Sequence, residues 1–149
     1  MTHYCGWLRS WCGTVIISKA KKWPTTAISS TETEIISMSE CARDVRPTRW
    51  ILTELGFPQK GPTVLWADNT SAIVNAEEEK RTTDRTKHIR IRDFFIRECV
   101  SIGEIMPLKA NTHHLSADML TKALARVKYE RFQGILQGTA PRAVDQKDT

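Results

Sequence analysis

Short apolar runs along the chain alternate with helical repeats, a pattern that predicts a mixed α/β protein. Residues 6–11 and 14–19, GWLRSW and TVIISK, are rich in β-branched and aromatic residues and predict two strands, with a third over 25–28. The lysine-rich run 19–22 is expected to mark a turn or a strand end. GEIMPLKA, residues 103–110, predicts a further strand, placed at a sheet edge because its proline cannot donate a ladder hydrogen bond.

A long helical pattern follows the first strands. Ser29 and Thr31 each precede a Glu by three residues, which is the capping-box pattern of a helix start. Apolar residues then recur at helical spacing at Ile35, Met38, Cys41 or Ala42, and Val45. Pro47 is expected to kink or break this helix. A second helical piece, TRWILTEL, is expected to end at Gly56 as its C′ residue.

The stretch TVLWADNTSAI, residues 63–73, reads as a buried strand that runs directly into Asp68 and then into a short helix ending near Asn75. One interpretation is a helix cap, since Asp and Asn accept hydrogen bonds from the free N–H groups at a helix start. The other is a metal ligand or catalytic acid at the carboxyl end of a strand, where open α/β sheets place their ligands. The pattern alone leaves both open.

The second half of the chain predicts two more helices. After a polar loop over 76–86, a helix from about Thr86 to Gly103 is expected to bury Ile91, Phe95, Cys99 and Ile102. A last helix is expected to begin near Ser116, with its apolar positions at Leu120, Leu124, Val127 and Phe132. Residues 137–149 are polar and show no periodicity, so they are expected to form a disordered tail.

The 149 residues are enough for one domain, expected over 1–136, followed by the tail. The chain is 40% hydrophobic and 26% charged, which is ordinary for a soluble globular protein. It has no apolar run of the roughly 18 residues that a membrane span needs, and no signal-peptide layout. Its four scattered cysteines predict reduced thiols. We therefore expect an intracellular protein, cytoplasmic or nuclear, that is not secreted.

The net charge is +5, and its location changes the picture. Residues 80–97 hold seven basic and two acidic side chains, so this segment accounts for all of it. A basic face of this kind favours an anionic partner such as nucleic acid. A solvated helix face explains the same charges, and the sequence does not decide between the two.

Three acids stand out as candidates for chemistry: Glu34, Asp68 and Asp118, the last in the first turn of the final helix. Glu34 shares a helical face with Met38 and Val45, and an acid in such a position is costly to bury unless it is paired or metal-bound. A first-turn acid that complements the helix dipole remains an alternative. Taken together, the three suggest a carboxylate cluster for Mg²⁺, which prefers oxygen ligands.

Several stretches in order carry a resemblance to a known family. They are SSTETEIISMSE (29–40), VLWADNTSAI (64–73), RTKHIRIRDFFIRE (85–98), SIGEI (101–105) and SADMLTKAL (116–124), with TVIISKAKKWPTTAISS before them. The sequence resembles the ribonuclease H region of the Pol polyprotein of copia-type retrotransposons over roughly residues 5–135. The resemblance implies an α/β fold, a ribonuclease H-like mixed sheet flanked by helices.

The resemblance also implies an activity, the Mg²⁺-dependent endonucleolytic cleavage of RNA in RNA/DNA hybrids. The family uses four acids around two Mg²⁺ ions, and the matching motifs place three of them at Glu34 (not Glu32), Asp68 and Asp118. The implied partners are an RNA/DNA hybrid and the reverse transcriptase portion of the parent polyprotein, with no membrane. The expected nucleic-acid contacts are Asn69, Ser71, Lys87, His88, Arg90 and Arg92, with capping of the following helix as the alternative for Asn69 and Ser71.

The sequence departs from the family in ways that bear on activity. The fourth acid lies on a first, central strand in the family, and no Asp or Glu precedes Glu32 here, so we expect an N-terminally truncated sheet. Arg90 stands where the family has an acid. His113 and His114 replace a polar-acidic pair, in a loop where a histidine assists product release in cellular ribonucleases H; a plain loop pair is the alternative. The competing hypothesis is therefore an inactive remnant, at most a basic nucleic-acid-binding module.

Overall fold

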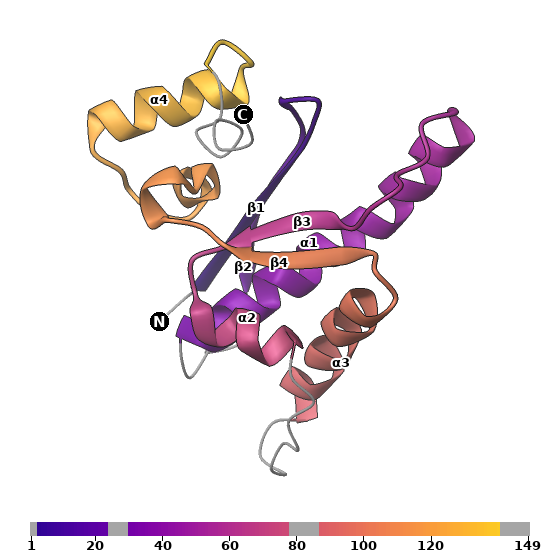
Figure 1. Cartoon of the computed structure of the whole chain (residues 1–149). Helices are drawn as coiled ribbons and strands as arrows, with labels where there is room; N and C mark the ends of the chain where they lie inside the picture. Colours follow the sequence, from indigo (N-terminus) through magenta and orange to yellow (C-terminus); the bar gives the residue numbers. More distant parts are fainter. Residues whose placement is uncertain (1–2, 24–29, 78–86, 141–149) are drawn as a thin grey trace. The chain divides into compact units, whose positions relative to one another are not determined.

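The structure is a computed structural model that describes residues 3–23, 30–77 and 87–140 (Figure 1). Its chain divides into two compact units. Unit 1 contains the hairpin and the C-terminal helices: β1 (His3–Trp11), β2 (Thr14–Trp23), η2 (Thr112–His114), η3 (Ser116–Leu120) and α4 (Arg126–Leu136). Unit 2 contains the segments between them: α1 (Ser30–Glu54), β3 (Thr63–Ala67), α2 (Thr70–Glu77), α3 (Lys87–Ser101) and β4 (Ile105–Lys109).

The first two strands form an antiparallel hairpin closed by Cys12 and Gly13. Both turn residues have positive φ, 49° and 78°, as the tight turns preferred in hairpins require. The prediction that residues 19–22 end the strand is wrong, because β2 continues to Trp23 and pairs as far as His3. The lysines of this run can belong to a strand because their charged side chains stay exposed to water, so strand pairing does not require burying a charge. The strand predicted over 25–28 lies outside the described residues.

Helix α1 runs as one element from Ser30 to Glu54, so the prediction that Pro47 breaks it is wrong. Pro47 is exposed, and the helix has buried side chains both before it, at Val45, and after it, at Leu52. The loss of one N–H donor is therefore tolerated on the solvent side. The predicted C′ glycine is confirmed: Gly56 has φ +86° and donates to the Thr53 carbonyl at 3.0 Å.

Unit 2 is built on a parallel pair of strands, β3 and β4, with Ala67 opposite Lys109 at their carboxyl ends. Leu65, Ala67 and Ile105 are buried on one face of this pair, where they join the core of α1, α2 and α3. The predicted apolar face of α1 is confirmed, and its buried members are Ile35, Met38, Ala42 and Val45. The other face of the pair carries Val64 and Met106, which are exposed.

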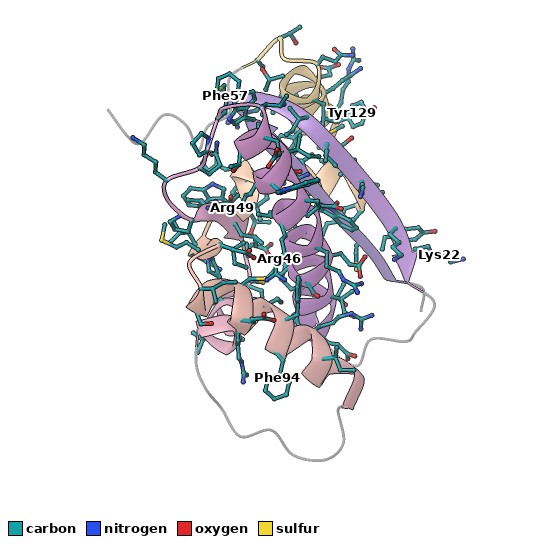
Figure 2. The ribbon with its side chains drawn as sticks, turned by 90° about the vertical axis from the view of Figure 1, so that its right-hand side faces the viewer. Lys22, Arg46, Arg49, Phe57, Phe94 and Tyr129 are labelled. Carbon is teal, nitrogen blue, oxygen red and sulfur yellow. The ribbon has the colours of Figure 1, made fainter. Side chains whose placement is uncertain are left out.

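Helix α3 has the predicted length but a different buried face. Phe95 and Cys99 pack on the core as expected, yet Ile91 and Ile102 are exposed and Ile96 is buried instead. Phe94 also points away from the core (Figure 2). Residues 95, 96 and 99 lie on one side of a straight helix, and this side faces the core. Residues 91 and 102 lie away from the middle of that side. The predicted register of this helix was therefore wrong at both ends.

The predicted final helix is two elements. Residues 116–120 form the 3₁₀ helix η3, and α4 begins only at Arg126, so the predicted single helix from Ser116 is wrong. Ser116 is buried inside η3, which Leu115 caps without a side-chain hydrogen bond. Val127 is exposed, whereas Phe132 is fully buried as expected. Residues 141–149 of the predicted tail lie outside the described part.

The described strands form two separate two-stranded sheets, β1–β2 and β3–β4, so the protein is of mixed α/β class. No helix in the parts of the chain that the structure describes is long and apolar enough to cross a membrane. The candidate acids fall in different units: Glu34 and Asp68 lie in unit 2, and Asp118 lies in unit 1.

Candidate functional site

The start of α1 and the carboxyl end of β3 are joined by one side-chain contact in unit 2. The Asn69 amide Nδ2 donates to the Thr31 hydroxyl Oγ1 at 3.3 Å. Thr31 lies about one helical turn before Glu34, and Asn69 directly follows Asp68. The contact therefore holds the turn that carries Glu34 close to the strand end that carries Asp68. Thr31 was expected as a possible cap, but it lies inside α1.

The cap of α2 is Asn69. Its Oδ1 accepts the Ala72 N–H at 3.1 Å, and its backbone carbonyl accepts the Ile73 N–H at 3.2 Å. The helix-cap role, one of the two interpretations of Asp68, is thus carried out by Asn69. Asp68 is half-buried immediately after β3, and Ser71 is exposed in the first turn of α2.

Lys109 is a neighbour of Asp68 that the sequence analysis missed. It ends β4 and is exposed, and its Nζ donates to the Asp68 backbone carbonyl. The parallel pairing of β3 with β4 brings the two together, because parallel strands place their carboxyl ends at the same sheet edge. No local sequence signal identifies this lysine, since it depends on strand register across more than forty residues.

Glu34 is half-buried on α1, between the solvent and the core residues Ile35 and Met38. The expectation that it shares the inward side of the helix fits the burial of Met38 and Val45 on the same face. Its neighbour Glu32 is also half-buried. Both acids lie within one helical turn of Thr31, the residue that the Asn69 amide contacts.

Asp118 has a different environment, inside unit 1. Its carboxylate is paired with two lysines: Lys122 Nζ lies 3.0 Å from Oδ1, and Lys128 Nζ lies 3.5 Å from Oδ2. The Asp118 backbone carbonyl accepts the N–H groups of Thr121 and Lys122 at 3.1 and 2.9 Å. The spacing of Asp118 and Lys122, four residues, indicates this pair from sequence, whereas the contact with Lys128 comes from the packing of α4 against η3.

The basic nucleic-acid candidates lie at the start of α3. Lys87, His88 and Arg90 belong to its first turn, and their side chains lie outside what the structure describes. Arg92 is half-buried on the same helix. The basic residues between 80 and 86 also fall outside the described residues, so the basic face remains a prediction. His113 and His114 are exposed in η2, which Asn111 caps by accepting the His113 N–H at 3.0 Å.

The three acids fit a Mg²⁺ site to different degrees. Mg²⁺ takes oxygen ligands and usually binds through one or two carboxylates. Glu34 and Asp68 are partly exposed carboxylates on two elements that the Thr31–Asn69 contact ties together, which suits such a pair. Both oxygens of Asp118, in contrast, already contact an ammonium group. Within residues 3–23, 30–77 and 87–140, no group of three or more His, Cys, Asp or Glu side chains is arranged to hold a metal ion.

Comparison with known proteins identifies relatives among transposon polyproteins. Over 125 residues, 84% of the chain, it is 36% identical to the retrovirus-related Pol polyprotein from transposon TNT 1-94 of Nicotiana tabacum. Over 113 residues, 76% of the chain, it is 34% identical to the retrovirus-related Pol polyproteins from transposons RE2 and RE1 of Arabidopsis thaliana. The chain spans 9% of the length of the first relative and 8% of each of the other two.

No family model matches the sequence, and no solved structure matches it. The chain is homologous to segments of retrotransposon Pol polyproteins, which supports a retroelement origin and a polyprotein context. The similarity extends over most of the chain, so it includes residues of both units.

Proposed function

We propose that this chain is a retrotransposon-derived ribonuclease H-like domain, whose reaction is the endonucleolytic cleavage of RNA in an RNA/DNA hybrid. The observation that carries the proposal is the hydrogen bond from Asn69 to Thr31. It ties the helix turn of Glu34 to the strand end of Asp68, the two positions at which the motifs of the ribonuclease H region place metal-binding acids. The homology to Pol polyproteins supports the same origin.

In this proposal the residues of unit 2 have two roles, metal binding and positioning of the metal-binding acids. Glu34 and Asp68 hold Mg²⁺, and the role of third metal-binding acid that the resemblance assigns to Asp118 of unit 1 stays a prediction. Bound Mg²⁺ ions activate water and stabilise the leaving oxygen in phosphodiester cleavage. Asn69 fixes the two acids relative to each other through its contacts with Thr31 and Ala72. Cleavage leaves a 3′-hydroxyl and a 5′-phosphate.

The hybrid is held by its phosphate backbone. Lys87, His88, Arg90 and Arg92 on α3, with Asn69 and Ser71, are the proposed contacts. Such contacts do not depend on sequence, and their affinity falls as salt rises, because each neutralised phosphate releases counterions. The reverse transcriptase portion of the parent polyprotein is the proposed protein partner.

A second candidate function is nucleic-acid binding without cleavage, by an inactive remnant of the same domain. The pairing of Asp118 with Lys122 and Lys128 favours it, since a metal at this carboxylate has to displace both ammonium groups. In this case the basic residues of α3 retain a function and the acids do not.

The two functions are separated by incubating the purified chain with a labelled RNA/DNA hybrid and Mg²⁺. A nuclease cuts the RNA strand, and Glu34→Gln or Asp68→Asn abolishes the cleavage while Glu32→Gln, the neighbouring acid on α1, retains it. An inactive binding module cuts nothing in any of these variants. It retains its affinity for the hybrid in Asp68→Asn and loses affinity in Arg90→Ala/Arg92→Ala. Equal cleavage by wild type and Asp68→Asn refutes the proposed site.

A further inference from the structure

The carboxylate of Asp118 is held inside unit 1 by charges that belong to the protein itself. Its side chain is 11% exposed, and each of its oxygens contacts one lysine ammonium. Burying a carboxylate is costly unless a counter-charge and hydrogen bonds replace water. Here the lysines supply that compensation, Lys122 from the segment that follows η3 and Lys128 from α4.

The two lysines are not equivalent. Lys122 is four residues from Asp118 and its side chain is 57% exposed, so it makes a solvent-facing pair of the kind that contributes little to stability. Lys128 is 26% exposed and is fixed by further contacts. Its Nζ donates to the Thr112 carbonyl at 3.2 Å and lies 5.3 Å from the centre of the Phe132 ring, which is fully buried.

These contacts place Lys128 between three segments of unit 1. Thr112 belongs to η2, Asp118 to η3, and Lys128 with Phe132 to α4. An ammonium group over an aromatic face is stabilised by the ring quadrupole, most strongly where water is excluded. Lys128 therefore loses all three contacts if it moves away from Asp118, and η3 loses its charged connection to α4.

We propose that Lys128 is the resident cation of the Asp118 carboxylate, and that Asp118 in this chain is a positioning residue that locks η3 to α4. A divalent cation needs the same carboxylate oxygens at about 2 Å, a position where it meets the charge of Lys128. Lysine pairing and metal binding at Asp118 thus exclude each other. The inference concerns unit 1 and stands whether or not Glu34 and Asp68 hold Mg²⁺.

Thermal unfolding of the full chain in EDTA and in MgCl₂ tests this proposal. In EDTA we expect Asp118→Asn and Lys128→Met each to lower Tm by roughly 5 °C, because the first removes the ion-pair partner of Lys128 and the second leaves the buried carboxylate with only the solvent-facing Lys122. Lys122→Met, the exposed member, is the matched control and is expected to change Tm by about 1 °C. The double variant Asp118→Asn/Lys128→Met is expected to unfold at a higher temperature than the sum of the two losses predicts.

The Mg²⁺ dependence supplies the second readout. Wild type and Asp118→Asn are expected to gain the same Tm on adding MgCl₂, since Asp118 takes no part in metal binding while Lys128 is present. Lys128→Met is expected to gain an additional rise that the double variant lacks. A Mg²⁺ response of the wild type that Asp118→Asn removes overturns the proposal, as does a Lys128→Met variant that responds like the wild type.

A measurement on the unsubstituted protein covers the case in which a variant does not fold. Mn²⁺ broadens the NMR signals of amides close to where it binds. Unchanged signals for residues 117–119 at Mn²⁺ concentrations that broaden those of residues 67–69 support the proposal, and broadening at 117–119 overturns it. If the proposed nuclease function is wrong, the hybrid assay shows no cleavage, and this result is independent of the signals of residues 117–119.

Discussion

The amide of Asn69 donates to the hydroxyl of Thr31 at 3.3 Å, across 38 residues of sequence. The same amide group's oxygen caps α2 through the Ala72 N–H. One side chain therefore caps the start of α2 and contacts the first turn of α1. The two candidate metal ligands of unit 2 flank this connection, so its stability sets how well they are placed.

Removing the Asn69 side chain should destabilise the protein more than removing the Thr31 hydroxyl. Asn69→Ala loses the cap and the contact with α1 and is expected to cost about 1–2 kcal/mol of unfolding free energy. Thr31→Val loses the contact alone and is expected to cost about 1 kcal/mol. Asn69→Asp is the control, because a carboxylate still caps α2 and the Thr31 hydroxyl can donate to it. Urea denaturation measures all three; an Asn69→Ala variant as stable as Asn69→Asp contradicts the assignment.

Gly6 is required by close packing of β1 against η3. A Cβ at this position would lie 2.7 Å from Thr121 Cγ2 and 2.9 Å from Leu120 Cβ, and neither atom is the end of a flexible side chain. We expect Gly6→Ala to cost about 1–3 kcal/mol, since the backbone must shift to relieve the overlap. Gly61→Ala is the comparison, because nothing lies within 4 Å of its Cβ position. Calorimetry that finds the two variants equally stable would show that η3 adapts freely.

Arg49 anchors the loop between α1 and β3. Its guanidinium donates to the carbonyls of Gly61 at 2.8 Å and Gln59 at 3.3 Å, and to the Thr63 hydroxyl at 3.0 Å (Figure 2 labels Arg49 on α1). Arg49→Met should cost about 1–3 kcal/mol, and Arg49→Lys should recover only part, because one ammonium cannot match the planar fork.

The loop itself provides the readout for Arg49. Limited proteolysis between residues 57 and 62 should accelerate in Arg49→Met, because the loop backbone loses its donors. Arg43→Met is the matched control: Arg43 is exposed on the same helix and has an ion pair with Glu40 at 3.6 Å. Its substitution is expected to leave the loop protected. Equal cleavage rates in the two variants argue against the anchor.

Cys99 makes a pH-dependent contribution to stability. Burial raises the pKa of the Cys99 thiol above its ordinary value of 9.0, against the opposing effect of the Arg46 charge. Arg46, labelled in Figure 2, donates from Nη2 to Cys99 Sγ at 3.6 Å and from Nε to Glu104 Oε2 at 2.8 Å. Above pH 9.0 the unfolded chain releases this proton while the folded chain retains it, so the folded state binds more protons there. The stability is therefore full below pH 9.0 and is lost as pH rises towards the folded pKa.

Unfolding measured in urea between pH 8 and pH 10.5 checks this behaviour. The unfolding free energy of the wild type should fall more steeply with pH than that of Cys99→Ala, by up to about 1.4 kcal/mol per pH unit. A thiol reagent at neutral pH should label the exposed Cys12 quickly and Cys99 slowly, since Cys99 is 1% exposed and protonated. Parallel pH profiles for the two chains would mean that Cys99 does not titrate in this range.

The local elements of unit 2 could be predicted from short-range patterns. The apolar repeat from Ile35 to Val45, the strand that ends before Asp68, and the glycine at 56 all follow from periodicity and turn chemistry, which neighbouring residues determine. The homology to Pol polyproteins agrees with the motifs that carry the resemblance. The metal-binding roles of Glu34, Asp68 and Asp118 and the contacts with nucleic acid stay predictions.

Other features depend on contacts between distant segments, and only the tertiary structure decided them. Pro47 remains inside α1, which has buried side chains both before and after it, and Ile91 is exposed because α3 turns Ile96 towards the core. Lys109 became the neighbour of Asp68 through the pairing of β3 with β4, and Asn69 contacts Thr31 across 38 residues, whereas its cap of α2 is a local contact.

Asp118 illustrates most directly which features local sequence determines and which features tertiary packing determines. Its sequence motif indicates an acid at a helix start, and the lysine four residues later indicates a surface pair. The burial of the carboxylate and its second contact arise only when α4 packs on η3 and brings Lys128 to it. Local sequence determines which groups a chain carries and the element each lies on. The charge that a buried group meets is decided by packing, because burial removes water and leaves only the neighbours that the fold supplies.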